Sequence, residues 1–164
     1  MIHVYIGDGK GKTTASVGLS TRTAGHGFSV LFIQFLKDDS SGEISVLKSL
    51  SGVEVVHAPI NYGFVFQMTE KQKSETAEEY DKLMDKAIES DAFLIVLDEV
   101  IHALNASLLK KAKIEKVLEK DCEIVLTGRD APEWLIDRAD YVSEIQKIKH
   151  PYDNGVQARI GIEF

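Results

Sequence analysis

Short apolar runs recur along the chain, separated by longer segments in which apolar and polar residues follow a helical spacing. The runs have the length and the β-branched and aromatic content of strands. Six strands are predicted, at residues 2–6, 30–35, 53–57, 92–99, 123–127 and 141–148. The second and fourth are almost continuously apolar, as strands are when both faces of a parallel sheet are covered. The pattern predicts an α/β fold with an open, mostly parallel six-stranded sheet and helices on both faces.

The segments between these strands carry helix start and stop signals. Thr69 and Gln72 have the spacing of a capping box, and Pro132 suits a first helical position. Helices are predicted from residue 12 to about 25, in a short segment ending near 50, from 69 to about 90, over 100–121 with a break at 105–107, and from 132 to about 138. The polar segment 37–43 is predicted to be a loop.

The stretch Gly7-Asp8-Gly9-Lys10-Gly11-Lys12-Thr13-Thr14 joins the first predicted strand to the first predicted helix. A glycine-rich turn ending in Gly-Lys-Thr, between a strand and a helix, is typical of a phosphate-binding loop. Its glycines let backbone N–H groups face one concavity, and the helix N-terminus adds its positive dipole end. Lys12 would contact phosphate oxygens and the Thr13 hydroxyl would ligate Mg²⁺. The stretch predicts a nucleoside triphosphate site.

This loop is one residue shorter than the usual motif. Three residues separate Gly7 from Gly11, where the usual pattern has four, and Ile6 stands where the first glycine would fall. A glycine-rich turn without a ligand is the alternative, but the flanking strand and helix favour a phosphate site. The shorter loop indicates unusual placement of the nucleotide and does not by itself name a reaction.

Two acids, Asp98 and Glu99, end the fourth predicted strand. An apolar strand that ends in acids is the usual partner of a phosphate-binding loop, because one acid can hold Mg²⁺ directly or through water. In open parallel sheets the ligand lies at the carboxyl edge of the strands, where the loop and these acids would meet. Asp98, Glu99 and Thr13 are therefore the predicted metal site, and which acid binds directly stays open.

Two further candidates each have a structural alternative. Residues 58–68 form an apolar, aromatic loop that either folds onto the core or provides a wall for a flat apolar ligand. Arg129 follows the fifth predicted strand and either clamps phosphate or sugar or forms a surface salt bridge.

Composition and charge narrow the class of protein. The chain has 164 residues, which predicts a single domain over 1–164. A net charge of −7 argues against a nucleic-acid-binding protein, since affinity for phosphate backbones comes from clustered Lys and Arg. One cysteine excludes an internal disulfide and a cysteine-based metal cluster. The longest apolar run is far too short to cross a bilayer, and no signal peptide is found, so a cytoplasmic protein is expected.

Taken together, these motifs make the chain similar to the P-loop type of ATP:corrinoid adenosyltransferases of bacterial cobalamin metabolism. The resemblance runs nearly end to end, and the shortened loop is the family's own form. Besides the loop with Ala15, it rests on Arg22, Gly25 with Gly27, 34–37, Gly42-Glu43, 96–99, 127–129, Ala139-Asp140, Ser143-Glu144, 149–152, Gly155 and 161–163.

The resemblance implies a P-loop NTPase (RecA-like) fold and transfer of the 5′-deoxyadenosyl group of ATP to the cobalt of a Co(I) corrinoid, with release of triphosphate. ATP would lie on the loop in reversed sense, exposing its 5′-carbon. Because the metal is the nucleophile, the protein must orient that carbon and stabilise charge on the triphosphate. The resemblance assigns these two tasks to Lys12, to Glu99 and to a Mg²⁺ ion held by Thr13 and Glu99. Lys10, Arg22 and Arg129 are further nucleotide-binding candidates.

In the resembled family an aromatic loop lies against the corrinoid and helps remove its lower axial ligand, which makes Co(II) easier to reduce. The matching segment here is Gly63-Phe64-Val65-Phe66, with Phe66 where the family often has tryptophan. Phe64 and Phe66 are therefore the predicted corrinoid-binding residues, with a smaller apolar area than tryptophan would give.

Partners are also implied by the resemblance: a homodimer and a flavoprotein reductant. The chain starts at its first predicted strand, without the family's usual N-terminal extension, so looser closure of the site across a dimer is expected. The alternative functions are a P-loop ATPase or phosphotransferase, a corrinoid- or nucleotide-binding protein without turnover, and, least favoured by the charge, a DNA-dependent ATPase.

Overall fold

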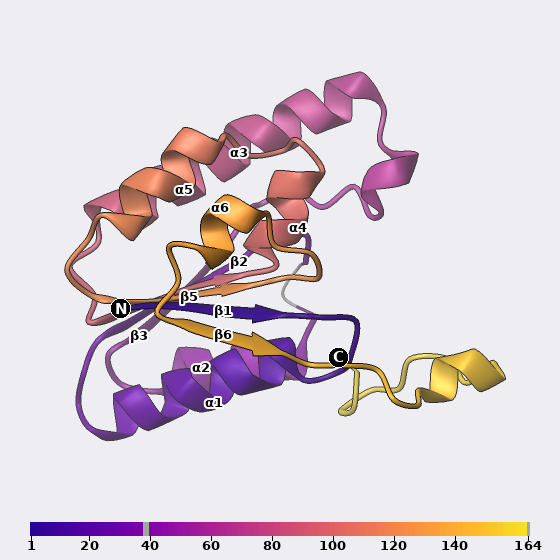
Figure 1. Cartoon of the computed structure of the whole chain (residues 1–164), viewed down its shortest axis with the longest axis horizontal. Helices are drawn as coiled ribbons and strands as arrows, with labels where there is room; N and C mark the ends of the chain where they lie inside the picture. Colours follow the sequence, from indigo (N-terminus) through magenta and orange to yellow (C-terminus); the bar gives the residue numbers. More distant parts are fainter. Residues whose placement is uncertain (38–39, 164) are drawn as a thin grey trace.

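The chain folds as a six-stranded sheet in which every strand pairing is parallel, with helices on both faces (Figure 1). A computed structural model describes residues 1–37 and 40–163. The strands are β1 (Ile2–Ile6), β2 (Val30–Gln34), β3 (Val53–His57), β4 (Leu94–Asp98), β5 (Glu123–Thr127) and β6 (Tyr141–Glu144), in the spatial order β3-β2-β4-β5-β1-β6. The predicted fold class is confirmed, and the arrangement is consistent with a P-loop NTPase-like fold.

The helices divide between the two faces of the sheet. They are α1 (Lys12–Gly25), α2 (Gly42–Ser49), α3 (Glu70–Glu89), α4 (Val100–Asn105), α5 (Lys111–Leu118) and α6 (Glu133–Ile136), with two short 3-10 helices, η1 (Val65–Gln67) and η2 (Pro151–Asn154). Helices α1 and α2 cover one face, and α3 to α6 cover the other (Figure 1). Across the described residues, none of these helices combines the length and apolar character that crossing a bilayer requires.

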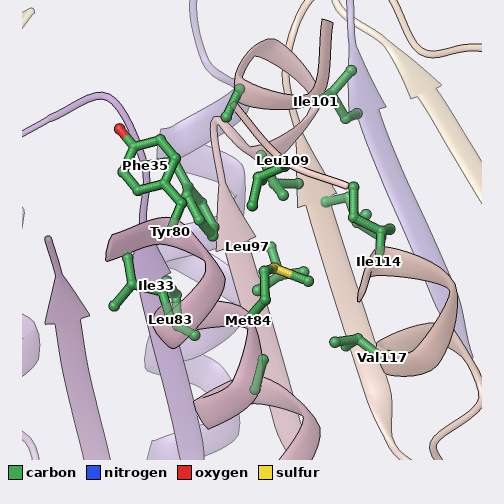
Figure 2. Close-up of a cluster of buried hydrophobic side chains, with 14 of the residues drawn as sticks. Ile33, Phe35, Tyr80, Leu83, Met84, Leu97, Ile101, Leu109, Ile114 and Val117 are labelled. Atoms are coloured by element: carbon green, nitrogen blue, oxygen red, sulfur yellow. The ribbon is translucent and has the colours of Figure 1, made fainter. Parts of the chain in front are cut away.

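The larger core lies between the sheet and α3, α4 and α5 (Figure 2). All residues of β2 and β4 are buried, which accounts for their apolar sequence up to the polar residues at their carboxyl ends, Gln34 and Asp98. Tyr80 of α3 packs edge-on against Phe35 with ring centroids 5.0 Å apart. A smaller cluster around Phe32 packs against α1 and α2. Helices cover both faces of the sheet, and the polar residues of β2 and β4, Gln34 and Asp98, lie at the carboxyl edge of the strands.

Several predicted boundaries agree with the structure, and a few are wrong. The capping box of Thr69 and Gln72 is formed at the start of α3, and the break between α4 and α5 lies in the predicted place. Pro132 caps α6 from outside instead of occupying its first turn. The predicted strand 141–148 is too long, because β6 ends at Glu144. The predicted polar loop 37–43 includes Asp38 and Asp39, which lie outside the described residues.

Candidate functional site

The glycine-rich loop is enclosed between the ends of β5 and β6. The Gly7 N–H donates to the carbonyl of Arg129 over 2.9 Å, and the Gly9 N–H donates to the carbonyl of Ile145 over 2.8 Å. A Cβ on Gly7 would lie 2.3 Å from the Ile145 carbonyl oxygen, and Gly7 has φ of +104°. Glycine is therefore required here by both space and conformation. These two N–H groups are engaged by the protein, so the amides left to face a ligand lie further along the loop.

The start of α1 is the open part of the loop. No side-chain hydrogen bond caps this helix within the described residues, and its N-cap is Gly11. The first N–H groups of a helix have no partner inside the helix, and the dipole makes this end positive. Lys12 and Thr13 occupy this first turn. The helix end is thus suited to an anion such as phosphate.

The Lys12 amine folds back over the loop. It donates to the carbonyl oxygens of Gly7 over 2.7 Å and Gly9 over 2.9 Å. Burial lowers the pKa of this amine below its ordinary value; the negative charge of Glu99 opposes the shift and the positive charge of Arg129 adds to it. Lys12 is therefore a partly desolvated cation, held by neutral carbonyls that phosphate oxygens can replace.

Asp98 is the centre of a buried polar network at the end of β4. Its side chain is 0% exposed, and the Thr13 and Thr127 hydroxyls donate to its Oδ1 over 3.0 and 2.8 Å. The Lys37 amine forms an ion pair with Oδ2 at 3.0 Å. The predicted meeting of the loop with the strand-end acids is present in the structure. Asp98 thus fixes the position of the Thr13 hydroxyl by accepting its hydrogen bond.

Glu99 points toward the ligand side of the same strand end. Its backbone is left-handed, with φ of 61°, and its N–H donates to the Thr127 hydroxyl over 2.8 Å. Non-glycine residues rarely adopt this conformation, which is common at functional sites. The carboxylate lies 3.6 Å from Nδ1 of His102. The two adjacent acids therefore differ, with Asp98 enclosed and Glu99 facing the cavity.

A cavity of about 620 Å³ adjoins this network, which lines it with Thr13, Lys37 and Glu99. Six of the predicted nucleotide-binding residues line it, namely Gly9, Lys10, Gly11, Lys12, Thr13 and Thr14. Glu99 and Lys37 line it as well, and so do Val17, Gly42, Glu43 and Val46. The chain's last described residues, 161–163, complete its wall, where the Lys10 amine bonds to the Ile162 carbonyl. Its volume falls within the range of about 300–1,000 Å³ typical of small-molecule sites.

The donor set around Thr13 suits a hard divalent cation. Hydroxyl and carboxylate oxygens are the ligands that Mg²⁺ prefers, and it usually keeps several waters and shares nucleotide phosphates. Within the described residues, the Gln34 side-chain oxygen is buried without a hydrogen-bond partner, and the Gln34 amide nitrogen lies 3.4 Å from Asp98. No cluster of three or more His, Cys, Asp or Glu that could hold a metal occurs in the described part of the chain. The residues fit a cation shared with phosphate rather than a protein-only metal site.

The profile of the family described as ATP:corrinoid adenosyltransferase BtuR/CobO/CobP matches residues 1–164. The chain belongs to this family. It is 31% identical to the corrinoid adenosyltransferase of Escherichia coli K12, with 100% of this chain and 85% of that protein aligned. It is 32% identical to corrinoid adenosyltransferase CobA of Salmonella typhimurium, with the same two coverages. A corrinoid adenosyltransferase of Sinorhizobium is 30% identical, over 100% of this chain and 80% of that protein.

Other residues named from the sequence of this adenosyltransferase family member lie outside the main cavity. Asp8 accepts a hydrogen bond from the Lys147 N–H over 2.9 Å, and this bond lowers the pKa of the Asp8 carboxyl. Arg129 lines a separate cavity of about 250 Å³ with His102 and Asp130. Arg22 is exposed in the last turn of α1, at the opposite end of the helix from Lys12. Of these three, Arg22 is the one that the structure separates from the site.

The aromatic loop of this family member is open to solvent. The rings of Phe64 and Phe66 stack with centroids 5.4 Å apart and planes inclined by 21°, and the side chains are 69% and 81% exposed. The base of the loop adjoins Lys37, which also lines the main cavity. The loop leaves the carboxyl end of β3 and extends beyond the sheet near the start of α3 (Figure 1). It thus presents a flat apolar surface at the edge that holds the cavity.

Several residues of the site received no role from the sequence. Lys37, Gln34, Thr127 and the segment 161–163 all lie in the matched stretches of this family. Their spacing carries no motif of its own, since each is brought to the loop by the tertiary fold. The signal that could have singled them out was the resemblance itself, combined with their position at strand ends.

Proposed function

We propose that this chain transfers the 5′-deoxyadenosyl group of ATP to the cobalt of a Co(I) corrinoid in cobalamin biosynthesis or salvage. A cobalt–carbon bond forms as the bond from C5′ to oxygen breaks; the electron pair of that bond leaves on inorganic triphosphate, and Co(I) becomes formally Co(III). The observation that supports this most is the phosphate-binding loop on the cavity floor in a chain that belongs to this family.

In this proposal the chain's own groups act on the nucleotide. Lys12, Lys10 and the free N–H groups at the start of α1 bind the triphosphate and stabilise the negative charge that grows on it. Fixing the phosphates also fixes the 5′-carbon for attack, which removes an entropic part of the barrier. No side-chain base is required, because the nucleophile is the metal of the substrate.

Mg²⁺ would be held by Thr13, Asp98 and Glu99 together with phosphate oxygens, where it would neutralise charge on the triphosphate. The observations that favour this assignment are the contact of Thr13 with Asp98 and the cavity-facing position of Glu99. We further propose that the protein is a single nucleotide-binding domain over 1–164, works in the cytoplasm as a homodimer, and uses a flavoprotein to reduce the corrinoid. The transfer corresponds to EC 2.5.1.17.

Removal of the Phe66 ring is expected to lower activity selectively when the reaction starts from Co(II) corrinoid, which must first be reduced. Phe66→Ala should lower adenosylation that starts from Co(II) corrinoid by about tenfold and change the reaction of chemically prereduced Co(I) much less, because a stacked aromatic ring contributes about 0.5–1.5 kcal/mol beyond the area it buries. The control is Phe28→Ala, which removes another exposed stacked ring at the amino end of β2. Equal losses with Co(II) and Co(I) would contradict the role of Phe66.

The pH dependence of triphosphate binding should report on Lys12. Phosphate favours the protonated Lys12 amine, so the affinity for triphosphate should fall as rising pH deprotonates it. Because burial lowers the pKa of Lys12, this fall is expected at a pH below the ordinary lysine pKa of about 10. Calorimetric titration of triphosphate at increasing pH would be compared for the wild type and Lys12→Arg, in which the charge persists. The ligand's own titration is common to both proteins. Parallel pH profiles would rule out Lys12 as the titrating group.

The test of the proposed function is an anaerobic assay with chemically reduced Co(I) cobalamin, Mg-ATP and the full chain. A light-sensitive Co–C product formed together with one equivalent of triphosphate would support it. ADP and phosphate without the Co–C product would indicate an ATPase or phosphotransferase. Binding of ATP and corrinoid without any product would indicate a binding protein.

A further inference from the structure

Lys37 places a cation between the two side chains expected to meet a metal ion. Its amine lies 3.0 Å from the Thr13 hydroxyl oxygen and 3.0 Å from Oδ2 of Asp98. These are the oxygens that a divalent cation bound with a nucleotide would use. An ammonium group and a divalent cation repel each other strongly at such short range. The two cannot share this position.

The backbone around Lys37 is shaped to deliver the amine there. Phe35 still follows the sheet, since its N–H donates to the Asp98 carbonyl over 2.9 Å. Leu36 then turns the chain with φ of 57°, a conformation that costs a non-glycine residue energy. The hydroxyl of buried Tyr80 holds this turn by accepting the Leu36 N–H over 2.7 Å. A strained turn fixed by a buried side chain is a built feature and not a random surface conformation.

Asp98 needs this cation as long as no metal is bound. It is completely buried, and its other contacts are neutral donors from Thr13, Thr127 and Gln34. Among the described residues, Lys37 is the cation within salt-bridge distance of Asp98. A buried carboxylate is stable when it is paired with a positive charge. The amine of Lys37 meets that need.

The Lys37 side chain is also placed to leave. It is 29% exposed and lines the main cavity, and its flexible stem allows the amine to move without shifting the backbone. Lys12 differs, because its amine bonds to two carbonyls of the loop itself. The cavity is therefore lined by two lysines of the phosphate loop, Lys10 and Lys12, and by Lys37, whose amine lies at the expected metal position.

We propose that Lys37 is an exchangeable placeholder for the divalent cation. Its amine neutralises Asp98 whenever no divalent cation is bound, excludes free divalent cations, and moves onto a phosphate oxygen when the cation enters with the nucleotide. This inference rests on the proposed nucleotide function. It makes divalent cation binding conditional on the phosphate ligand, because a metal that enters without phosphate breaks the ion pair between Lys37 and Asp98 and leaves the amine no phosphate contact to replace it.

The test measures cation and phosphate binding separately in the full chain. Mn²⁺ binding, followed by electron paramagnetic resonance without nucleotide, is expected to be about tenfold tighter in Lys37→Met than in the wild type, because the competing amine is gone. Calorimetry with Mg²⁺ and inorganic triphosphate should show no such gain for the same variant, because the phosphate contact that is lost offsets the competition that is removed. Mn²⁺ should also raise the melting temperature of Lys37→Met more than that of the wild type.

Two variants serve as controls. Lys37→Arg keeps the charge and should bind free Mn²⁺ as weakly as the wild type. Lys71→Met removes an exposed lysine of α3 and should change neither affinity. Unchanged or weaker Mn²⁺ binding by Lys37→Met, or tight binding by Lys37→Arg, would overturn the proposal. None of these readouts uses a corrinoid, so failure of adenosyl transfer would be seen separately.

Discussion

Lys12→Ala is expected to remove adenosyl transfer and to weaken ATP binding by about a hundredfold. The amine is partly desolvated and lines the cavity beside the open start of α1. Charge-assisted hydrogen bonds to phosphate are about twice as strong as neutral ones, and losing two of them gives a change of this size. Because the same amine would stabilise the departing triphosphate, turnover should fall further, by about a thousandfold or more.

Arg22→Ala is the matched control for this experiment. It removes a cation from the same helix, but from its exposed last turn at the opposite end. Its ATP affinity is expected to stay close to that of the wild type. The measurement is calorimetric titration of Mg-ATP, together with the anaerobic transfer assay. Near-normal activity of Lys12→Ala would contradict the assignment of the loop, and a large loss in Arg22→Ala would return that residue to the site.

The strands were predictable because a short run of apolar and β-branched residues is a local signal that can be read without the tertiary contacts. β1, β3 and β5 begin and end where the apolar runs do. The error at β6 has a physical cause. The Ile145 N–H still donates to the Ile6 carbonyl at the end of β1, but the Ile145 carbonyl accepts the Gly9 N–H. The chain therefore leaves the sheet there to hold the loop, although its apolar pattern continues.

The candidate site was predictable only as far as its motifs reach. The loop and the strand-end acids are local patterns, and the parallel sheet brings Thr13 and Asp98 together, as predicted. The different surroundings of Asp98 and Glu99 arise from the left-handed turn at Glu99, which no neighbouring residue signals. The contributions of Lys37 and of residues 161–163 depend on tertiary contacts over long sequence separations. The roles assigned to these residues remain predictions.

Gly7→Ala is expected to disrupt the loop and to destabilise the fold. The new Cβ would lie 2.3 Å from the Ile145 carbonyl oxygen, which is backbone and cannot rotate away. Gly7 also has φ of +104°, a value that alanine adopts only with strain. Together these effects should lower the free energy of unfolding by about 2–4 kcal/mol. ATP binding should be lost, because the Lys12 amine rests on the Gly7 carbonyl.

The same substitution at Gly18 should have the opposite effect on stability. Gly18 lies inside α1, and a Cβ there would meet no atom within 4 Å. Alanine favours a helix over glycine by about 0.5–1 kcal/mol, so Gly18→Ala should raise the free energy of unfolding and leave ATP binding intact. Urea unfolding and Mg-ATP calorimetry on both variants separate the two cases. If Gly7→Ala were as stable as the wild type and bound ATP normally, the loop would not pack closely against Ile145, and glycine would not be required at position 7.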